Sequence, residues 1–316
     1  MPSPTTKPGK GKGARGLKFV VTVVVLVAAA GYAAYRYNDD SGPEAAGCTV
    51  RSDGAALQLT PDQASNAATI AAVATSRELP ERALTIALAT ALQESQLENL
   101  DHGDRDSLGL FQQRPSQGWG TTAQILDPVH ASNEFFDSLV KIEGYTRLPL
   151  TVAAQEVQKS GYPQAYAKQE ADATTLTTAL TGHIAGALSC TTGADTPYSA
   201  GGRLGSTATV TARLDKEFGD QVQPREDSGQ PRTIAVPSTP AAGAAAADGT
   251  RRGWELAQWA VAHAHDLKVE QVSFGGMNWL AAESEKGWQK QSAGGGKGES
   301  AAVSPTDGLV RITVAS

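Results

Sequence analysis

The sequence has few residues of the types that bind metals or carry thiol chemistry. Its 316 residues include only two cysteines and five histidines. Neither cysteine, Cys48 or Cys190, lies in a CxxC pair or in a Cys/His cluster. This spacing argues against a zinc ribbon or a redox dithiol centre, so we expect no catalytic or metal-binding role for either thiol.

Basic residues are also scarce beyond the first part of the chain. The first 38 residues hold six basic side chains and no acidic one, namely Lys7, Lys10, Lys12, Arg15, Lys18 and Arg36. The rest of the chain has 21 Lys and Arg against 33 Asp and Glu, a net charge of about −12. A protein that binds phosphate backbones needs a basic surface, so we predict no nucleic-acid partner.

One apolar run, from Leu17 to Tyr35, is long enough to cross a bilayer, and only Lys18 and Thr22 interrupt it. At a rise of about 1.5 Å per residue, such a helix matches the hydrocarbon thickness of roughly 30 Å. We therefore predict a basic cytoplasmic tail at 1–16 and a membrane helix at 17–37 that contacts lipid. By the positive-inside rule the N-terminus is cytoplasmic and the rest of the chain is extracellular.

Two other interpretations of this segment remain open. Ala28, Ala29 and Ala30 could form the cleavage site of a secretory signal peptide. A lipoprotein site at Cys48 is a weaker alternative, because Asp39, Asp40 and Glu44 separate that cysteine from the apolar run.

Both cysteines follow the apolar run, in the part of the chain that we place in an oxidising compartment, where disulfides persist. We therefore predict a disulfide between Cys48 and Cys190. On the entropy model it would restrict the unfolded chain by about 5 kcal/mol, as an upper figure.

Between the cysteines the pattern is helical. Helix start signals occur at Thr60-Pro61, Pro80 and Asp127-Pro128, and apolar residues recur at helical spacing after each. Two further helices are expected at Thr151 to Lys159 and Tyr166 to Leu188. We predict a linker at 38–47 and an all-α domain at 48–190.

The remaining chain has a mixed pattern. A Gly/Thr/Ser-rich linker at 191–206 precedes a predicted small α+β domain at 207–316. Its expected helices are Val210 to Phe218 and Trp254 to Leu267, and its expected strands are Thr233 to Val236, Val269 to Phe274 and Leu309 to Val314. The predicted fold class is thus α+β overall, with one N-terminal transmembrane helix.

The most specific motif lies at the end of the Pro80 helix. Glu94-Ser95 is followed fifteen residues later by Gly109-Leu110-Phe111-Gln112, and then by Pro115. This combination resembles lytic transglycosylases and goose-type lysozymes, whose signature is a helix ending in Glu-Ser, a loop and then G-L-x-Q followed by Pro.

The resemblance implies a lysozyme-like fold at 48–190 that acts on the glycan strands of peptidoglycan, without a cofactor. It implies Glu94 as the catalytic acid and Gln112 as a cleft residue. It also places Phe111, where methionine is usual, and Arg114 in the cleft, with Tyr166 as the candidate cleft tyrosine. Trp119 could stack on a sugar or belong to the core. The sequence identifies no protein partner.

The position of Glu94 agrees with an acid role. A carboxylate at the C-terminal end of an apolar helix meets desolvation and the negative end of the helix dipole, and both favour the protonated form that a general acid needs. Glycosidases with two carboxylates need a second acid, for which the candidates are Asp101, Asp104 and Asp106. The one-acid route, assisted by the N-acetyl group of the substrate, is the one that we favour.

The C-terminal part more distantly resembles zinc D-Ala-D-Ala carboxypeptidases. Their last strand supplies a metal ligand in an Asp-His-x-His pattern, whereas this chain has Asp307-Gly308-Leu309-Val310-Arg311. His263 and His265 are two apart on a predicted helix and point to different faces. We expect this domain to hold no metal.

Two hypotheses follow for the whole chain. The first is a membrane-anchored enzyme that cleaves peptidoglycan glycan strands. The alternative is a non-catalytic, wall-binding or scaffolding protein with a degenerate lysozyme-like fold. A transporter is a poor third, because one helix cannot build a pathway.

Overall fold

The computed structural model describes residues 46–52, 54–159, 163–193, 204–238, 246–291 and 308–316. The tail predicted at 1–16, the membrane helix predicted at 17–37 and nearly all of the linker predicted at 38–47 lie outside these residues. In the described part, no helix is both long and apolar enough to cross a bilayer. The membrane helix in the predicted fold class is therefore not found in the α+β architecture that the structure describes.

The two cysteines lie in a small sheet that the sequence did not predict. Strands β1 (Gly47–Ser52), β2 (Ala55–Leu59) and β3 (Leu188–Thr191) form an antiparallel sheet in the order β2-β1-β3. Cys48 and Cys190 are paired across β1 and β3 and form the predicted disulfide, which is confirmed. The prediction of an all-α domain at 48–190 is wrong, because β1 finds its partner β3 about 140 residues further along the chain.

The helices that follow β2 begin where their capping residues indicate. Helix α2 (Pro61–Ser76) has the complete capping box of Thr60 and Gln63, with a proline in its first turn. Helix α3 (Glu81–Ser95) is buried along most of its length, since only its two ends carry charged side chains. Helix α5 (Pro128–Leu139) is capped by Asp127. These three starts confirm the predicted helices, apart from a one-residue shift at Pro80.

The helical part is completed by short elements. They are η1 (Pro115–Gln117), α4 (Thr122–Ile125), α6 (Leu150–Gln158), η2 (Pro163–Gln169) and α7 (Glu170–Leu180). The single helix predicted from Tyr166 to Leu188 is wrong. The chain turns at Gly182, whose φ is +77° and where a Cβ would lie 2.0 Å from the Arg251 carbonyl oxygen, so the backbone continues into β3 instead.

The second sheet has six antiparallel strands in the order β4-β5-β9-β6-β7-β8. Strands β6 (Val269–Phe274) and β9 (Leu309–Val314) coincide with the predicted strands, and β5 (Thr233–Pro237) extends the predicted one by a residue. On β9, Val310, Ile312 and Val314 are buried while the alternate residues are partly exposed. The other elements are α8 (Thr207–Phe218), η3 (Gly219–Gln221), β4 (Arg225–Glu226), β7 (Met277–Leu280), η4 (Ala281–Lys286) and β8 (Gln289–Lys290).

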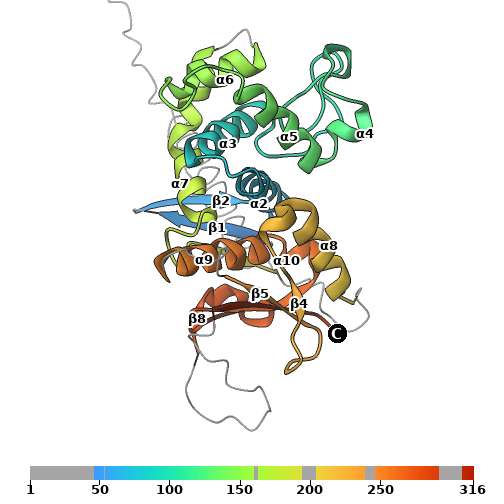
Figure 1. Ribbon diagram of the computed structural model, residues 1–316, viewed down its shortest axis with the longest axis vertical. Coiled ribbons are helices and arrows are strands. Elements are labelled where there is room, and N and C mark those ends of the chain that lie inside the picture. Colours follow the sequence, from blue (N-terminus) through green and yellow to red (C-terminus); the bar gives the residue numbers. More distant parts are fainter. Residues whose placement is uncertain (1–45, 53, 160–162, 194–203, 239–245, 292–307) are drawn as a thin grey trace, which may run out of the picture. The chain divides into compact units, whose positions relative to one another are not determined.

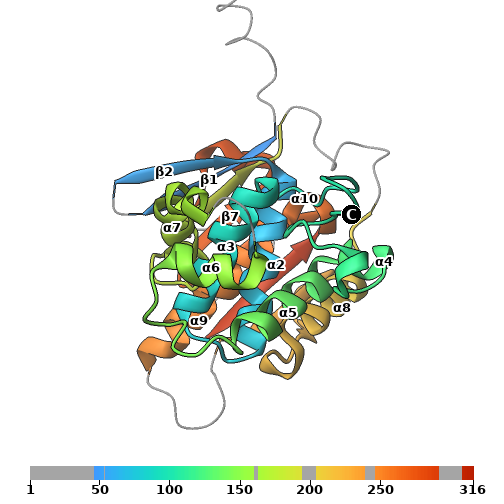
Figure 2. The ribbon, with the colours of Figure 1, turned by 90° about the horizontal axis from the view of Figure 1, so that it is seen from above.

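Helix α9 (Ala246–Ala262) connects the two sheets. It packs on β6 and β9 on one side and on β3, α2 and α7 on the other, and Figure 1 shows it between the sheets. The predicted helix Trp254–Leu267 is divided at His263, after which α10 (Ala264–Leu267) begins. Residues Ala46–Ser316 thus form one compact unit. Its helical layer lies nearest the viewer in Figure 2, and most of the large sheet follows these helices in the sequence.

A buried cluster around Glu217 of α8 joins the helical layer to α9. The carboxylate accepts hydrogen bonds from the Trp259 indole (2.7 Å) and the Thr69 hydroxyl (2.9 Å), and both partners come from other helices. Arg213 lies 3.2 Å and His263 Nε2 3.3 Å from its oxygens. Burial by itself raises the pKa of Glu217, but the attraction of His263, the two nitrogen donors and Arg213 together lower it below its ordinary value.

His263 is in turn held by a second polar group. Its Nδ1 lies 2.9 Å from the Ser65 hydroxyl of α2, and that hydroxyl is 3.0 Å from Asp266 of α10. The side chains of Glu217 and His263 are completely buried. The cluster therefore ties α2, α8, α9 and α10 together.

Candidate functional site

Glu94 lies in the last turn of α3, where the helix ends. Gln96 adopts the left-handed conformation (φ +55°), and its N–H bonds back to the carbonyls of Ala91 and Leu92. This closure exposes Glu94 partly to solvent while the next residue, Ser95, stays buried. The half-buried carboxylate is thus placed at the boundary between the core and the loop that carries the rest of the motif.

Tyr166 is the partner of Glu94. Its hydroxyl donates a hydrogen bond of 2.6 Å to Glu94 Oε1, although 72 residues separate the two in the sequence. The tyrosine is fully buried, in η2, which packs against α3. We predicted Tyr166 as a residue that lines the cleft, but the structure places it in the core, where it orients the Glu94 carboxylate.

The Gly-Leu-Phe-Gln motif forms the tip of a hairpin. Leu108 and Gln113 exchange two backbone hydrogen bonds of 2.9 Å and close the turn. Gly109 has a φ of +73°, and a Cβ there would lie 2.7 Å from the Ile125 carbonyl oxygen, so only glycine fits. The hydroxyl of Ser95 donates to the Leu110 carbonyl at 2.8 Å. This bond attaches the hairpin to the end of α3, beside Glu94.

Gln112 has a constrained position on the hairpin. Its φ is +47°, which is rare outside glycine, and its side-chain amide lies against the loop of Gly103. A Cβ on Gly103 would come within 1.8 Å of Gln112 Oε1. The absence of a side chain at Gly103 therefore leaves the space that the Gln112 amide occupies.

Phe111 is a core residue. Its ring is fully buried and stacks on Phe135 of α5 at a centroid distance of 4.6 Å. A side chain without exposed surface does not contact a ligand, so the predicted substrate contact of Phe111 needs correction. Its carbonyl oxygen accepts a hydrogen bond of 2.7 Å from Gln158 at the end of α6, which joins the hairpin to that helix.

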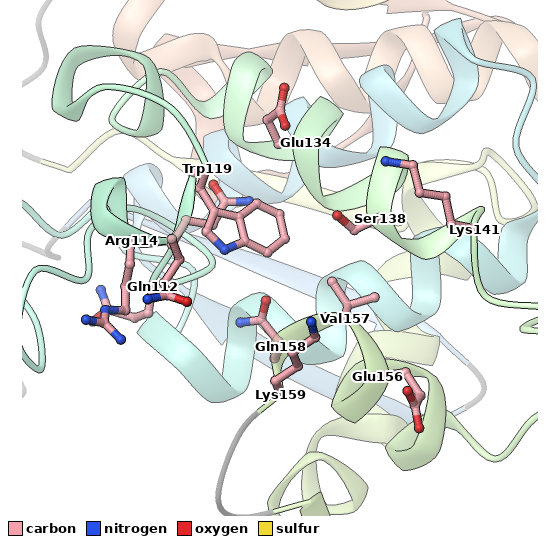
Figure 3. A pocket seen from close by; sticks show the side chains of 13 residues that line it. Gln112, Arg114, Trp119, Glu134, Ser138, Lys141, Glu156, Val157, Gln158 and Lys159 are labelled. Carbon is pink, nitrogen blue, oxygen red and sulfur yellow. The ribbon is translucent and has the colours of Figure 1, made fainter.

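An open groove lies between the hairpin, α5 and α6, and encloses about 560 Å³. Gln112 and Arg114 line this groove, and their predicted contact with substrate stays a prediction. Trp119 is half-buried, and its indole occupies the space between α5 and the end of α6 (Figure 3). The other polar side chains of the lining are Gln113, Gln117, Glu134, Ser138, Lys141, Glu156, Gln158 and Lys159.

The loop aspartates are held by local partners. Asp106 accepts from Arg114 Nε at 2.7 Å and from the Ser116 N–H at 2.9 Å, and these hydrogen bonds hold its pKa far below the ordinary range. Asp101 is exposed and bonds to His102, which also lowers its pKa. Asp104 is highly exposed beside Arg105. Asp106 therefore fixes the base of the hairpin in its charged form.

The histidines near the C-terminal sheet have separate environments. His263 belongs to the buried Glu217 cluster, whereas His265 is half-exposed, with Nδ1 at 3.6 Å from Asp266. Within the described ranges, no group of three or more His, Cys, Asp or Glu side chains is arranged to hold a metal ion.

Several groove residues were not predicted from the sequence. Glu134, Lys141, Gln158 and Lys159 come from the exposed faces or the ends of α5 and α6. Polar residues at such positions are common in any surface helix, so their spacing carries no signal of a site.

Two comparisons of the sequence with known proteins find no relative. No model of a known protein family matches the sequence, and a search of curated proteins finds none with significant similarity.

Proposed function

We propose that this protein cleaves the glycan strands of peptidoglycan, with Glu94 as the general acid. The observation that carries the proposal is the hydrogen bond from Tyr166 to Glu94 beside the Gly-Leu-Phe-Gln hairpin. A carboxyl group, a hydroxyl donor that orients it and a polar groove nearby are the parts that an acid-catalysed glycosidase requires.

In this proposal the two oxygens of Glu94 have different roles. Tyr166 occupies Oε1 from the buried side. In the proposed reaction, Oε2 carries the proton and delivers it to the glycosidic oxygen as the C1–O bond breaks. The orientation matters because proton transfer needs a donor within hydrogen-bond reach of the leaving oxygen.

The reaction that we favour uses a single carboxylate. Asp106 is engaged by Arg114 and Ser116, and Asp101 by His102, so neither is positioned by the protein as a second catalytic group. The N-acetyl oxygen of the substrate stabilises the developing charge at C1. The C6 hydroxyl of the same sugar then attacks C1 and returns a proton to Glu94, which gives a 1,6-anhydro product without water.

An extracellular, wall-facing location is part of this proposal. The Cys48–Cys190 bond supports it, because structural disulfides persist in oxidising compartments.

Digestion of purified peptidoglycan tests the proposal. We expect the wild-type protein to release anhydro-muropeptides and Glu94→Gln to release none above background, since the amide cannot donate the proton. Glu98→Gln, an exposed glutamate four residues further on, is the matched control and should retain wild-type activity. Reducing-end products would indicate hydrolysis instead.

Two outcomes would contradict the proposal. One is equal release by the wild type and Glu94→Gln, which would remove Glu94 from the chemistry. The other is no release by either protein together with retained binding to the wall polymer, which would favour a scaffolding function.

A further inference from the structure

Two lysines that line the groove form no ion pair with an acidic residue in the described part of the chain. The chain is acidic overall, with a net charge of −6. Most basic side chains of its described part lie within 4 Å of a carboxylate, among them Arg77, Arg82, Arg105, Arg114, Arg213, Lys216, Arg232, Arg251, Arg252, Lys286 and Arg311. Lys141 and Lys159 line the groove without such a pair to any described residue. Both ammonium groups are thus available to a ligand.

The two lysines come from different walls of the groove. Lys141 follows the end of α5, and Lys159 ends α6 in a left-handed conformation (φ +50°). Each lies at a helix C-terminus, where the dipole favours a cation. That local effect accounts for a lysine at one helix end, but it does not explain why both face the same groove.

The remaining lining suits a peptide. Gln112 and Gln158 offer amide groups, Trp119 offers an aromatic surface, and Glu134 on the α5 wall complements an amino group. Gln158 also bonds to the hairpin, and the tip of this hairpin is attached to Ser95, the neighbour of Glu94. A ligand in the groove therefore contacts the hairpin that is attached to the end of α3.

We propose that this groove binds the acidic stem peptide of peptidoglycan, with Lys141 and Lys159 facing its carboxylates. This inference rests on the proposed function, and it names the part of the polymer that the protein recognises. A stem peptide carries free carboxylates, an amino group and a chain of amides, whereas a glycan without peptides carries only the short lactyl carboxylate of each N-acetylmuramic acid. The protein then discriminates peptide-substituted strands from bare ones.

Binding measurements on the full chain test the inference. Glu94→Gln serves as the parent protein, so that the ligand is not consumed. The probes are a tetrasaccharide of N-acetylglucosamine and N-acetylmuramic acid with its stem peptides, the same tetrasaccharide without peptides and with its lactyl carboxyl groups amidated, and the peptide form with its carboxylates amidated. Isothermal titration calorimetry gives the affinity for each probe.

We expect the peptide form to bind about three- to twentyfold more tightly than the other two, since two exposed ion pairs act together. Lys141→Gln/Lys159→Gln should remove this preference, and high salt should reduce it in the parent. Lys290→Gln, an exposed lysine of β8 outside the groove, is the matched control and should keep the preference.

Three results would overturn the inference. They are equal affinity for the peptide and bare forms, equal affinity for the acidic and amidated forms, and a preference that survives in the double variant. If the wild type nevertheless releases anhydro products, only the inference has failed. If it neither cleaves peptidoglycan nor binds any probe, the proposed function has failed as well.

Discussion

Glu217 and Glu94 are both glutamates near the end of a helix, but their surroundings are opposite. Glu217 is completely buried and has four partners from three helices. Glu94 is partly exposed, and the Tyr166 hydroxyl donates a hydrogen bond to one of its two oxygens. The carboxylate of Glu217 has its hydrogen-bonding capacity satisfied inside the protein, whereas no described residue is hydrogen-bonded to the second oxygen of Glu94.

This difference separates a structural carboxylate from the proposed general acid. A buried charge is tolerated only when it is paired and hydrogen-bonded, so the partners of Glu217 are needed for folding. A carboxylate that acts on a substrate must instead retain free capacity and a fixed orientation. On this view, changes at Glu217 affect the free energy of unfolding, and changes at Glu94 affect the rate of reaction.

The largest effect is expected for Glu217→Ala. The substitution leaves the buried Trp259 N–H and Thr69 hydroxyl without their acceptor and Arg213 without its counter-ion, and we expect a loss of about 3–5 kcal/mol in the free energy of unfolding. Denaturant titration followed by circular dichroism measures it. Glu226→Ala, at an exposed position of β4, should change stability by less than about 0.5 kcal/mol. A similar small loss for Glu217→Ala would show that the cluster does not hold the layers together.

Glu94→Gln should give the converse result. Loss of a general acid slows catalysis by about 10²–10⁴-fold, which corresponds to about 3–5 kcal/mol in the activation barrier. The free energy of unfolding should change by less than about 0.5 kcal/mol, because the side chain is half-exposed and the amide still accepts the Tyr166 hydrogen bond. Rates of anhydro-muropeptide release and denaturant titrations of the same samples give both quantities. A variant that is strongly destabilised would place Glu94 with the structural carboxylates.

Tyr166→Phe should have an intermediate effect, since Tyr166 is a positioning residue. Removal of a hydrogen bond to a carboxyl group costs about 1.5–3 kcal/mol when that group is charged, so we expect turnover to fall by roughly 10- to 100-fold. The phenyl ring still fills the buried site. The pH profile of the rate should also shift, which a packing defect alone would not cause. Unchanged turnover and an unchanged profile would show that the hydrogen bond does not orient the acid.

Local signals explain what could be predicted from the sequence. The capping box at Thr60 and the proline after Asp127 act within one helical turn, so α2 and α5 begin where predicted. Strands β6 and β9 have the predicted bounds, because each alternates or clusters apolar residues over six positions. The disulfide was predicted because no other cysteine was present.

Long-range pairing explains what could not be predicted. Strand β1 pairs with its neighbour β2 and also with β3, far along the chain, and its six residues carry no strong pattern alone. Thr69, Glu217 and His263 meet because α2, α8 and α9 pack together, and no spacing in the sequence indicates it. Glu94 and Gln112 could be named as candidate site residues because their motif is local in the sequence. The lysines of the groove could not, because only the packing of α5 and α6 brings them together.

The pH dependence of stability provides the smallest and most specific test of the comparison. The folded-state pKa of Glu217 is lowered, so its contribution is complete above the unfolded value of about 4.5 and is lost as the pH falls toward the folded value. Glu217→Gln does not titrate there. The stability difference between wild type and this variant should therefore shrink below about pH 4.5, by up to about 1.4 kcal/mol per pH unit. Asp227 also has a lowered pKa, because the Gly229 N–H and Arg311 together outweigh the effect of burial, which raises it. Asp227 is present in both proteins, so its contribution cancels from the difference. A difference that stays constant between pH 7 and pH 3 would mean that the Arg213 and His263 charges do not stabilise the Glu217 carboxylate, and the distinction between the two glutamates would then rest on burial alone.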